Sequence, residues 1–171
     1  MSNIRIGHML LGIYQTNCYF VYREGSDQAL VFDPADHGEK IEEALEQHGL
    51  HTAAVFLTHG HFDHISGCEE LKAAADAYAG ERGENPVKIY AGEAEKKFLL
   101  DTKNNLSKAM GSPVTVIADV YLKDGEELEL DGIRIQVLAT PGHTAGGVSY
   151  YFPEGGFLIC GDTLFQESVG R

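Results

Sequence analysis

The stretch Thr58-His59-Gly60-His61-Phe62-Asp63-His64 places three imidazoles and one carboxylate side by side in the chain. It directly follows the apolar run 53–57, whose length and content predict a buried strand. His59 and His61 are two residues apart, which does not fit one face of a helix but suits a tight loop that turns both rings toward one point. The sequence therefore predicts a cluster of potential metal ligands at the end of a strand.

Asp63 and His64 follow at once, so a second group of ligands can face a neighbouring point. Imidazole combined with carboxylate suits zinc, iron or manganese, whereas calcium and magnesium sites consist mostly of oxygen ligands. The alternative is a polar surface loop that happens to be rich in histidine. The chain has eight histidines, and three of them gather here without any low-complexity tract, which favours metal binding.

The composition indicates one globular unit, and we expect a single domain over residues 1–171. Apolar residues make up 43% of the chain, and no uninterrupted apolar run approaches the roughly 18 residues that a membrane span needs, so we expect no span. Residues 1–5 lack the long apolar core of a signal peptide, and the cysteine count of three is odd. These features favour a reducing cytoplasm as the location.

The formal net charge of −13, without clusters of lysine or arginine, argues against a nucleic-acid partner. We expect a small-molecule substrate, no membrane partner, and a surface that is compatible with an oligomer. Bound cations would offset part of the negative charge locally.

The first two thirds of the chain combine strands with helices. The expected strands are 4–21 (two strands joined by a turn), 29–32, 53–57 and 87–90. The expected helices are 40–48, a helix that begins at Asp63 or His64 and runs to Ala77, and 93–100. Residues 101–118 show no assignable pattern. Asp33 ends a strand just before Pro34, and on position alone it is more often a simple turn former.

The last third predicts an antiparallel meander, in which two Asp-Gly turns flank residues 126–130 and lead into 133–139. Two further strands are expected at 147–152 and 157–160. His143 and Asp162 follow strands, as His59 does, so all three are expected on one rim of the sheets. Taken singly, His143 is more often a turn residue and Asp162 more often a cap.

Three motifs together resemble the metallo-β-lactamase fold superfamily: His59-x-His61-x-Asp63-His64, Pro141-Gly142-His143-Thr144 and Gly161-Asp162-Thr163-Leu164-Phe165. Asp33-Pro34 and Thr16-Asn17-Cys18-Tyr19 also look like the opening strands of that family. The resemblance runs along nearly the whole chain. It is closest to the hydroxyacylglutathione hydrolase (type II glyoxalase) branch.

The resemblance implies an α/β fold, namely an αββα sandwich with a metal site at the sheet edges. The implied ligands of a first cation are His59, His61 and His143. The implied ligands of a second cation are Asp63 and His64, with Asp162 bridging the pair. Asp33 resembles the family's acid that orients the histidine loop through hydrogen bonds, which replaces its interpretation as a turn former.

The chain departs from the family pattern after His143, because the family's final histidine on a late loop is missing. We therefore expect that a C-terminal strand and helix portion is absent, that the second cation position is weakly occupied, and that a partner chain covers the exposed surface. Arg171 lies in a segment that resembles one near the family's site, where it would bind a substrate carboxylate. A frayed terminus is the alternative.

The implied reaction is hydrolysis of a thioester such as a hydroxyacylglutathione by a metal-bound hydroxide, which Asp63 holds and orients. One or two zinc ions are expected, with iron or manganese as alternatives. A persulfide dioxygenase with one iron on His59, His143 and Asp162, a lactone or phosphoester hydrolase, and an inactive metal-binding fragment remain open. The three cysteines are expected in the core rather than as nucleophiles; they are Cys18, Cys68 and Cys160.

Overall fold

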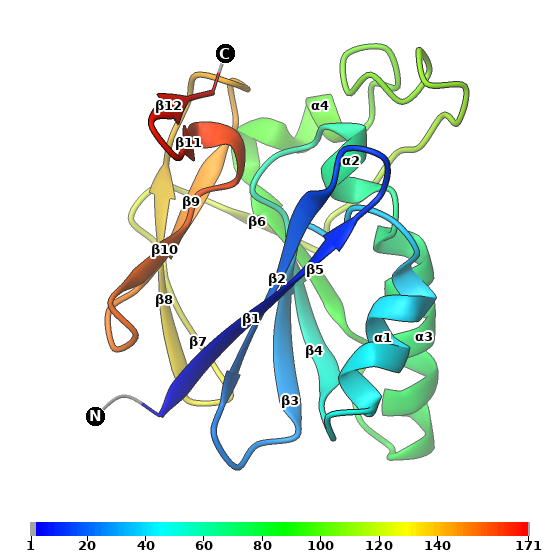
Figure 1. Ribbon diagram of the computed structural model, residues 1–171, viewed down its shortest axis with the longest axis vertical. Coiled ribbons are helices and arrows are strands. Elements are labelled where there is room, and N and C mark those ends of the chain that lie inside the picture. The colour runs from blue at the N-terminus through cyan, green and yellow to red at the C-terminus, as the bar shows by residue number, and fades with distance from the viewer. Residues whose placement is uncertain (1–2, 171) are drawn as a thin grey trace.

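The computed structural model describes residues 3–170, which form two β-sheets packed face to face (Figure 1). The first sheet has the strand order β1-β2-β3-β4-β5-β6, and its last four strands run parallel. Its strands are β1 (Ile4–Leu11), β2 (Thr16–Arg23), β3 (Gln28–Phe32), β4 (His51–Phe56), β5 (Lys88–Gly92) and β6 (Val120–Leu122). The strands expected near these positions are thereby confirmed.

The second sheet is the expected antiparallel meander, with the order β10-β9-β8-β7. Its strands are β7 (Glu127–Leu130), β8 (Ile133–Ala139), β9 (Val148–Phe152) and β10 (Phe157–Ile159). A small hairpin follows, formed by β11 (Leu164–Phe165) and β12 (Ser168–Val169), after the short 3-10 helix η2 (Gly161–Thr163).

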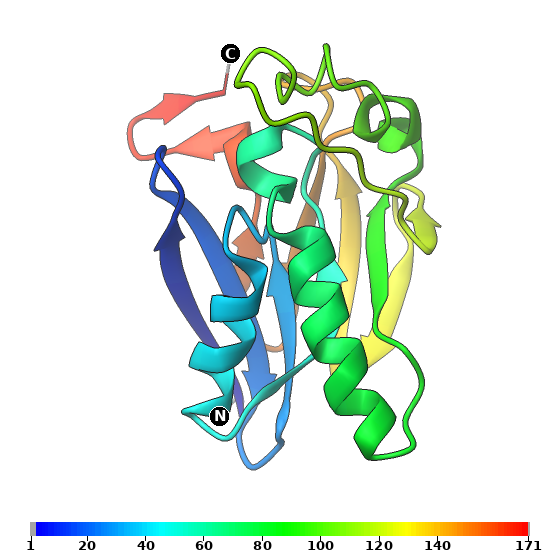
Figure 2. The same ribbon diagram turned by 90° about the vertical axis from the view of Figure 1, so that its right-hand side faces the viewer.

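Helices cover the outer face of the first sheet. Figure 2 shows α1 (Gly38–Glu46) and α3 (Cys68–Glu81) side by side in front of it. Ile41, Leu45 and Leu71 are fully buried between these helices and the sheet. Over residues 3–170, no helix lies on the outer face of the second sheet, so the described chain has three layers of the expected αββα arrangement. Within the same residues, no helix is long and apolar enough to cross a bilayer.

Aliphatic side chains and a cluster of aromatic rings fill the space between the two sheets. Phe32 and Phe56 lie on paired strands and stack at 4.9 Å, and both contact Tyr150 of the second sheet edge to face. These three side chains are fully buried, and the Tyr150 hydroxyl donates a 2.8 Å hydrogen bond to the Leu57 carbonyl. This packing fixes the position of the chain just before Thr58, where the histidine loop begins.

The helix expected from residue 63 to 77 is wrong in one respect, because it is two helices. The first is α2 (Phe62–Ile65), and α3 begins only at Cys68. The backbone N–H of Gly67 turns away to donate to the Pro34 carbonyl at 2.8 Å, and a Cβ at this position would lie 3.0 Å from that oxygen. Glycine thus allows the break that docks α2 on the loop after β3.

The segment without an assignable pattern lies between α4 (Lys96–Leu99) and β6, and contains turns but neither helix nor strand. The buried Asn105 and Ser107 side chains hold it together by donating hydrogen bonds to the Val114 carbonyl at 2.9 and 3.2 Å. The expected helix over 93–100 is confirmed as the 3-10 helix η1 (Glu93–Glu95) followed by α4.

Candidate metal centre

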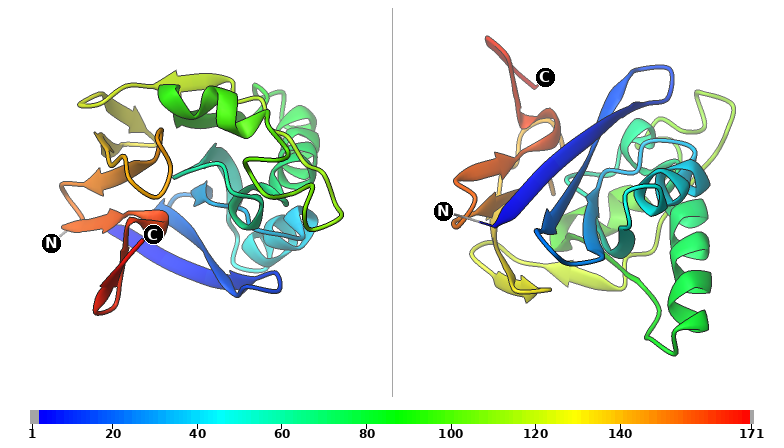
Figure 3. Two further views of the ribbon diagram at one scale, coloured as in Figure 1. Left: turned by 90° about the horizontal axis from the view of Figure 1, so that it is seen from above. Right: turned by 60° about the horizontal axis from the view of Figure 1, so that its bottom comes forward.

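The loops that follow β4, β8 and β10 gather at one rim of the sandwich, as the view from above shows (Figure 3, left). His59 and His61 lie on the loop after β4, and His143 lies on the loop after β8. The His61 Nδ1 and His143 Nε2 atoms are 2.8 Å apart, and the His59 ring centroid lies 4.9 and 4.8 Å from those of His61 and His143. One nitrogen of each ring lies within 4.8 Å of the others, which is close enough for one cation to contact all three.

A second group of ligand atoms adjoins the first and shares His59 with it; its members are His59, His64 and Asp162. The Asp162 carboxylate lies between the two groups, with Oδ1 3.3 Å from His64 Nε2 and Oδ2 3.5 Å from His143 Nε2. Asp63 is more peripheral, since its Oδ2 lies 3.9 Å from His64 Nε2 and accepts a hydrogen bond from Thr16 Oγ1. The structure thus brings together all six residues that the sequence suggested as ligands.

Asp33 lies behind the histidine loop and accepts three hydrogen bonds from it. Its carboxylate accepts from the Thr58 backbone N–H at 2.7 Å, the Thr58 hydroxyl at 2.6 Å and His64 Nδ1 at 3.0 Å. Asp33 is only 2% exposed and has a positive φ of 53°, a conformation that aspartate tolerates better than most residues. A buried carboxylate with these partners fixes the orientation of the loop and of the His64 ring.

The tautomer of His59 follows from the same network. The Thr58 hydroxyl has one hydrogen and gives it to Asp33, so its 3.1 Å contact with His59 Nδ1 requires an N–H at Nδ1. His59 Nε2 therefore carries a lone pair. That atom is buried and has no hydrogen-bond partner among residues 3–170. Because a buried polar atom without a partner is costly, a cation at Nε2 fits this site.

The electrostatics of the histidines divides them into two kinds. Burial lowers the pKa of His59 well below its usual value, and the neighbouring imidazoles lower it further. Burial and His143 likewise lower the pKa of His61, so both rings offer neutral lone pairs. Burial opposes the charged form of His64, but Asp33 and Asp162 outweigh it and raise its pKa to about 10. A cation at His64 must therefore displace a proton.

Glu95 is part of the site although the sequence gave no reason to select it. The side chain comes from η1, is 1% exposed, and accepts hydrogen bonds from Gly60 N at 2.9 Å and Thr144 Oγ1 at 3.2 Å. A third hydrogen bond comes from the Gly146 backbone. One carboxylate thus ties the loop of His59 and His61 to the loop of His143. Burial raises its pKa, although the hydrogen bonds oppose this effect.

We expect Glu95→Gln to weaken zinc binding by about tenfold to a hundredfold, the usual effect of losing a group that orients ligands. Glutamine can present only one oxygen, so one of the two loops loses its acceptor. Competition with a chromophoric chelator measures the affinity. Glu93→Gln is the matched control, because Glu93 lies on the same short helix and is exposed. Equal affinities for the two variants would show that Glu95 does not position the loops.

An open cavity of about 470 Å³ reaches the metal centre, with His64, Asp63 and Asp162 in its wall. Cys160 also lines this cavity, which corrects the expectation that all three cysteines belong to the core. β10 ends at Ile159 and the backbone turns into η2, so the Cys160 side chain is partly exposed, whereas Cys18 and Cys68 are buried. Arg171, suggested as a substrate ligand, lies outside the described residues.

A family model described as the metallo-beta-lactamase superfamily matches residues 11–171. The probable metallo-hydrolase YqgX of Bacillus subtilis is 36% identical over 95% of this chain and 72% of its own length. The hydroxyacylglutathione hydrolase GloC of Haemophilus influenzae is 30% identical over 92% of this chain and 71% of its own length. The crystal structure of the B3 metallo-beta-lactamase BLEG-1 superposes with a TM-score of 0.80 at 34% identity, covering 98% of this chain and 76% of that one.

Proposed function

This chain belongs to the metallo-beta-lactamase superfamily, and on that premise we propose that it is a metal-dependent hydrolase whose substrate is a thioester. The observation that carries the proposal is the pair of ligand groups that share His59, with the Asp162 carboxylate between them. A hydroxyacylglutathione is the first substrate to test, because the relative from Haemophilus influenzae is named a hydroxyacylglutathione hydrolase.

In this proposal His59, His61 and His143 would hold one cation, and His64, Asp63 and Asp162 would hold a second. Bound cations would lower the pKa of a water molecule, so that hydroxide forms near neutral pH, and would polarise the carbonyl under attack. Asp63 lies at the edge of the centre, where its carboxylate would accept a hydrogen bond from the attacking water and keep it oriented. Asp33 holds the His64 ring directly and the His59 ring through Thr58.

The leaving group is what favours a thioester over other esters. A thiolate is a good leaving group because thiols ionise near pH 8.5, so the protein need not supply a strong acid. In the described walls of the large cavity there is no lysine or arginine, and the tyrosines that line it are Tyr14 and Tyr19. Burial raises the pKa of Tyr19, which makes it a poorer proton donor. An alkoxide is a more basic leaving group than a thiolate, so it would depend more on such a donor.

The proposal is tested with the zinc-loaded chain and a panel of thioesters, a lactone and a phosphoester. We expect hydrolysis of at least one thioester, its loss when a chelator removes the metal, and its return with added zinc. Elemental analysis gives the number of ions bound. Faster hydrolysis of the lactone or phosphoester would reassign the substrate class, and metal binding without any hydrolysis would contradict an enzymatic function.

Iron chemistry is a second candidate, favoured by one observation. His59, His64 and Asp162 form a group of two imidazoles and one carboxylate, the set typical of non-haem iron oxygenases. It differs from the set that the sequence suggested, in which His143 took the place of His64. A chain loaded with ferrous iron that consumes oxygen only in the presence of a persulfide would support a dioxygenase, and no oxygen uptake would exclude it.

A further inference from the structure

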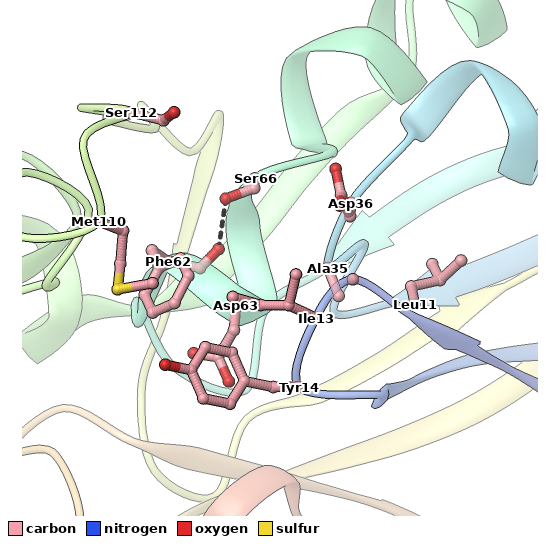
Figure 4. A pocket seen from close by; sticks show the side chains of 11 residues that line it. Leu11, Ile13, Tyr14, Ala35, Asp36, Phe62, Asp63, Ser66, Met110 and Ser112 are labelled. Carbon is pink, nitrogen blue, oxygen red and sulfur yellow. Dashed lines mark hydrogen bonds between the residues drawn. The ribbon is translucent and has the colours of Figure 1, made fainter.

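A smaller cavity of about 230 Å³ lies beside the metal centre, and the mechanism above does not use it (Figure 4). Three parts of the fold form its walls: the turn between β1 and β2, helix α2 with the loop after β3, and the long segment between α4 and β6. Its lining residues are mainly apolar, and the side chains that form its apolar surface are Leu11, Ile13, Tyr14, Ala35, Phe62 and Met110.

This cavity adjoins the metal centre rather than standing apart from it. Asp63 and Tyr14 line both the small cavity and the 470 Å³ cavity that contains His64 and Asp162. Figure 4 shows Asp63 beside the Tyr14 ring, and that ring meets the Phe62 ring edge to face at 5.6 Å. The small cavity therefore lies next to the Asp63 carboxylate, at the edge of the metal centre.

The rim of the cavity carries apolar side chains that face solvent. Ile13 is 77% exposed, Tyr14 58% and Met110 41%. Ile13 and Tyr14 lie next to each other in the β1–β2 turn, and Met110 lies across the cavity from them. Such a cluster of exposed apolar groups at the mouth of a concave site is typical of a ligand-binding surface, because an apolar ligand removes it from water.

The charged groups of the small cavity disfavour an anionic ligand there. Asp36 and Asp63 are the charged groups of the small cavity, and within residues 3–170 neither cavity is lined by lysine or arginine. An anionic substituent in the small cavity would meet the Asp36 carboxylate at short range, and no lysine or arginine among residues 3–170 lines that cavity to offset it. The Asp63 carboxylate would be offset by the cation that it holds in the proposed function. The volume lies below that of sites that enclose whole small ligands, roughly 300–1,000 Å³, so it suits one substituent only.

We propose that the small cavity binds an uncharged, apolar substituent of the thioester, and that the chain therefore prefers neutral thioesters to glutathione conjugates. The glutathione moiety carries two carboxylates and one ammonium group, so it is both anionic and polar. The inference rests on the proposed thioester hydrolysis and names the class of thioester within it. Its test needs a measurement that does not depend on turnover.

Binding of thioethers, which cannot be hydrolysed, provides that measurement. The probes are S-hexyl-N-acetylcysteamine, which is neutral, and S-hexylglutathione, which is anionic. The chain has three methionines, so carbon-13 labelling of their methyl groups gives a simple NMR spectrum. We expect the neutral probe to shift the Met110 signal and not that of Met9, which packs against the core. S-hexylglutathione should need an at least tenfold higher concentration to shift the Met110 signal by the same amount.

Adding a positive charge at the rim gives the matching kinetic test. Ile13→Lys should raise kcat/KM for an anionic thioester relative to a neutral one by about tenfold, because it adds a cation at the mouth of the cavity. Ile117→Lys is the matched control, since Ile117 is 71% exposed and lies outside both cavities. An equal rise in this ratio of kcat/KM values in the two variants would overturn the inference.

The outcomes separate the two proposals. A selective Met110 shift without hydrolysis of any thioester supports the cavity assignment and rejects the proposed reaction. Thioester hydrolysis without that shift, or with tighter binding of S-hexylglutathione, supports the reaction and overturns the cavity assignment. A Met110 signal that responds to protein concentration and not to either probe would show that a second copy of the chain covers the rim. That result would also overturn the cavity assignment.

Discussion

His59→Ala is expected to abolish binding of the first cation and to lower thioester hydrolysis by about a thousandfold or more. His59 is one of the three imidazoles proposed to hold this cation, and its Nε2 is a buried atom without a hydrogen-bond partner among residues 3–170. Losing this cation removes several kcal/mol of transition-state stabilisation, and each 1.4 kcal/mol corresponds to about a tenfold change in rate. Elemental analysis and the thioester assay measure the two effects.

His48→Ala is the control for this variant, because His48 is an exposed imidazole at the end of α1. It should bind as many ions as the wild type and hydrolyse the thioester at the same rate. As much bound zinc in His59→Ala as in the wild type, with activity retained, would mean that His59 does not hold a cation. Unfolding curves in chelator establish that the variant is folded, so that a loss of metal is not mistaken for a loss of structure.

Asp33→Asn is expected to weaken zinc binding by about tenfold to a hundredfold and to destabilise the metal-free fold by about 3–5 kcal/mol. The amide group keeps the shape of the side chain but loses the charge and one acceptor, while Thr58 and His64 still present their donors to it. The His64 ring, only 3% exposed, then has no carboxylate at its Nδ1. Competition with a chelator measures the zinc affinity, and urea unfolding measures the stability of the metal-free fold.

The destabilisation by Asp33→Asn should depend on pH in a defined direction. Asp33 and Asp162 raise the pKa of folded His64 to about 10, against about 6.5 for an unfolded histidine. The ion pair therefore stabilises the fold fully below pH about 6.5 and ceases to do so as the pH rises through 10. Measured in chelator, the difference between variant and wild type should shrink over that range.

Asp27→Asn removes a carboxylate that is exposed and paired with Arg82 at the surface. It should change the unfolding free energy by less than about 1 kcal/mol and leave zinc affinity unchanged. If Asp33→Asn behaved like Asp27→Asn, the three hydrogen bonds to Asp33 would not be what orients the histidine loop.

The elements were predictable wherever the pattern of apolar residues was regular. β4 was expected from the run before Thr58, and the meander of β7 to β10 was expected from its Asp-Gly turns and alternating side chains. The helix expected from residue 63 failed at Gly67. Its break depends on a hydrogen bond to Pro34, a residue remote in the sequence, and local propensity carries no signal for such a contact.

The ligand motifs were equally visible, for a different reason. His59, His61, Asp63 and His64 lie so close along the chain that no tertiary contact is needed to bring them together. Glu95 gave no signal at all. It is one of two acidic residues on a short helix, and only the packing of η1 against two loops distinguishes it from the exposed Glu93.

The sequence by itself determined which residue types are available for a metal centre and which strands deliver them, because both are written in short-range spacing and periodicity. The tertiary structure decided how those residues are held. The parallel pairing of Phe32 with Phe56 sets Asp33 beside Thr58, and the irregular segment before β6 supplies Met110 to the small cavity. Strand order, register and loop packing are properties of contacts between distant segments, and no local pattern in the chain encodes them.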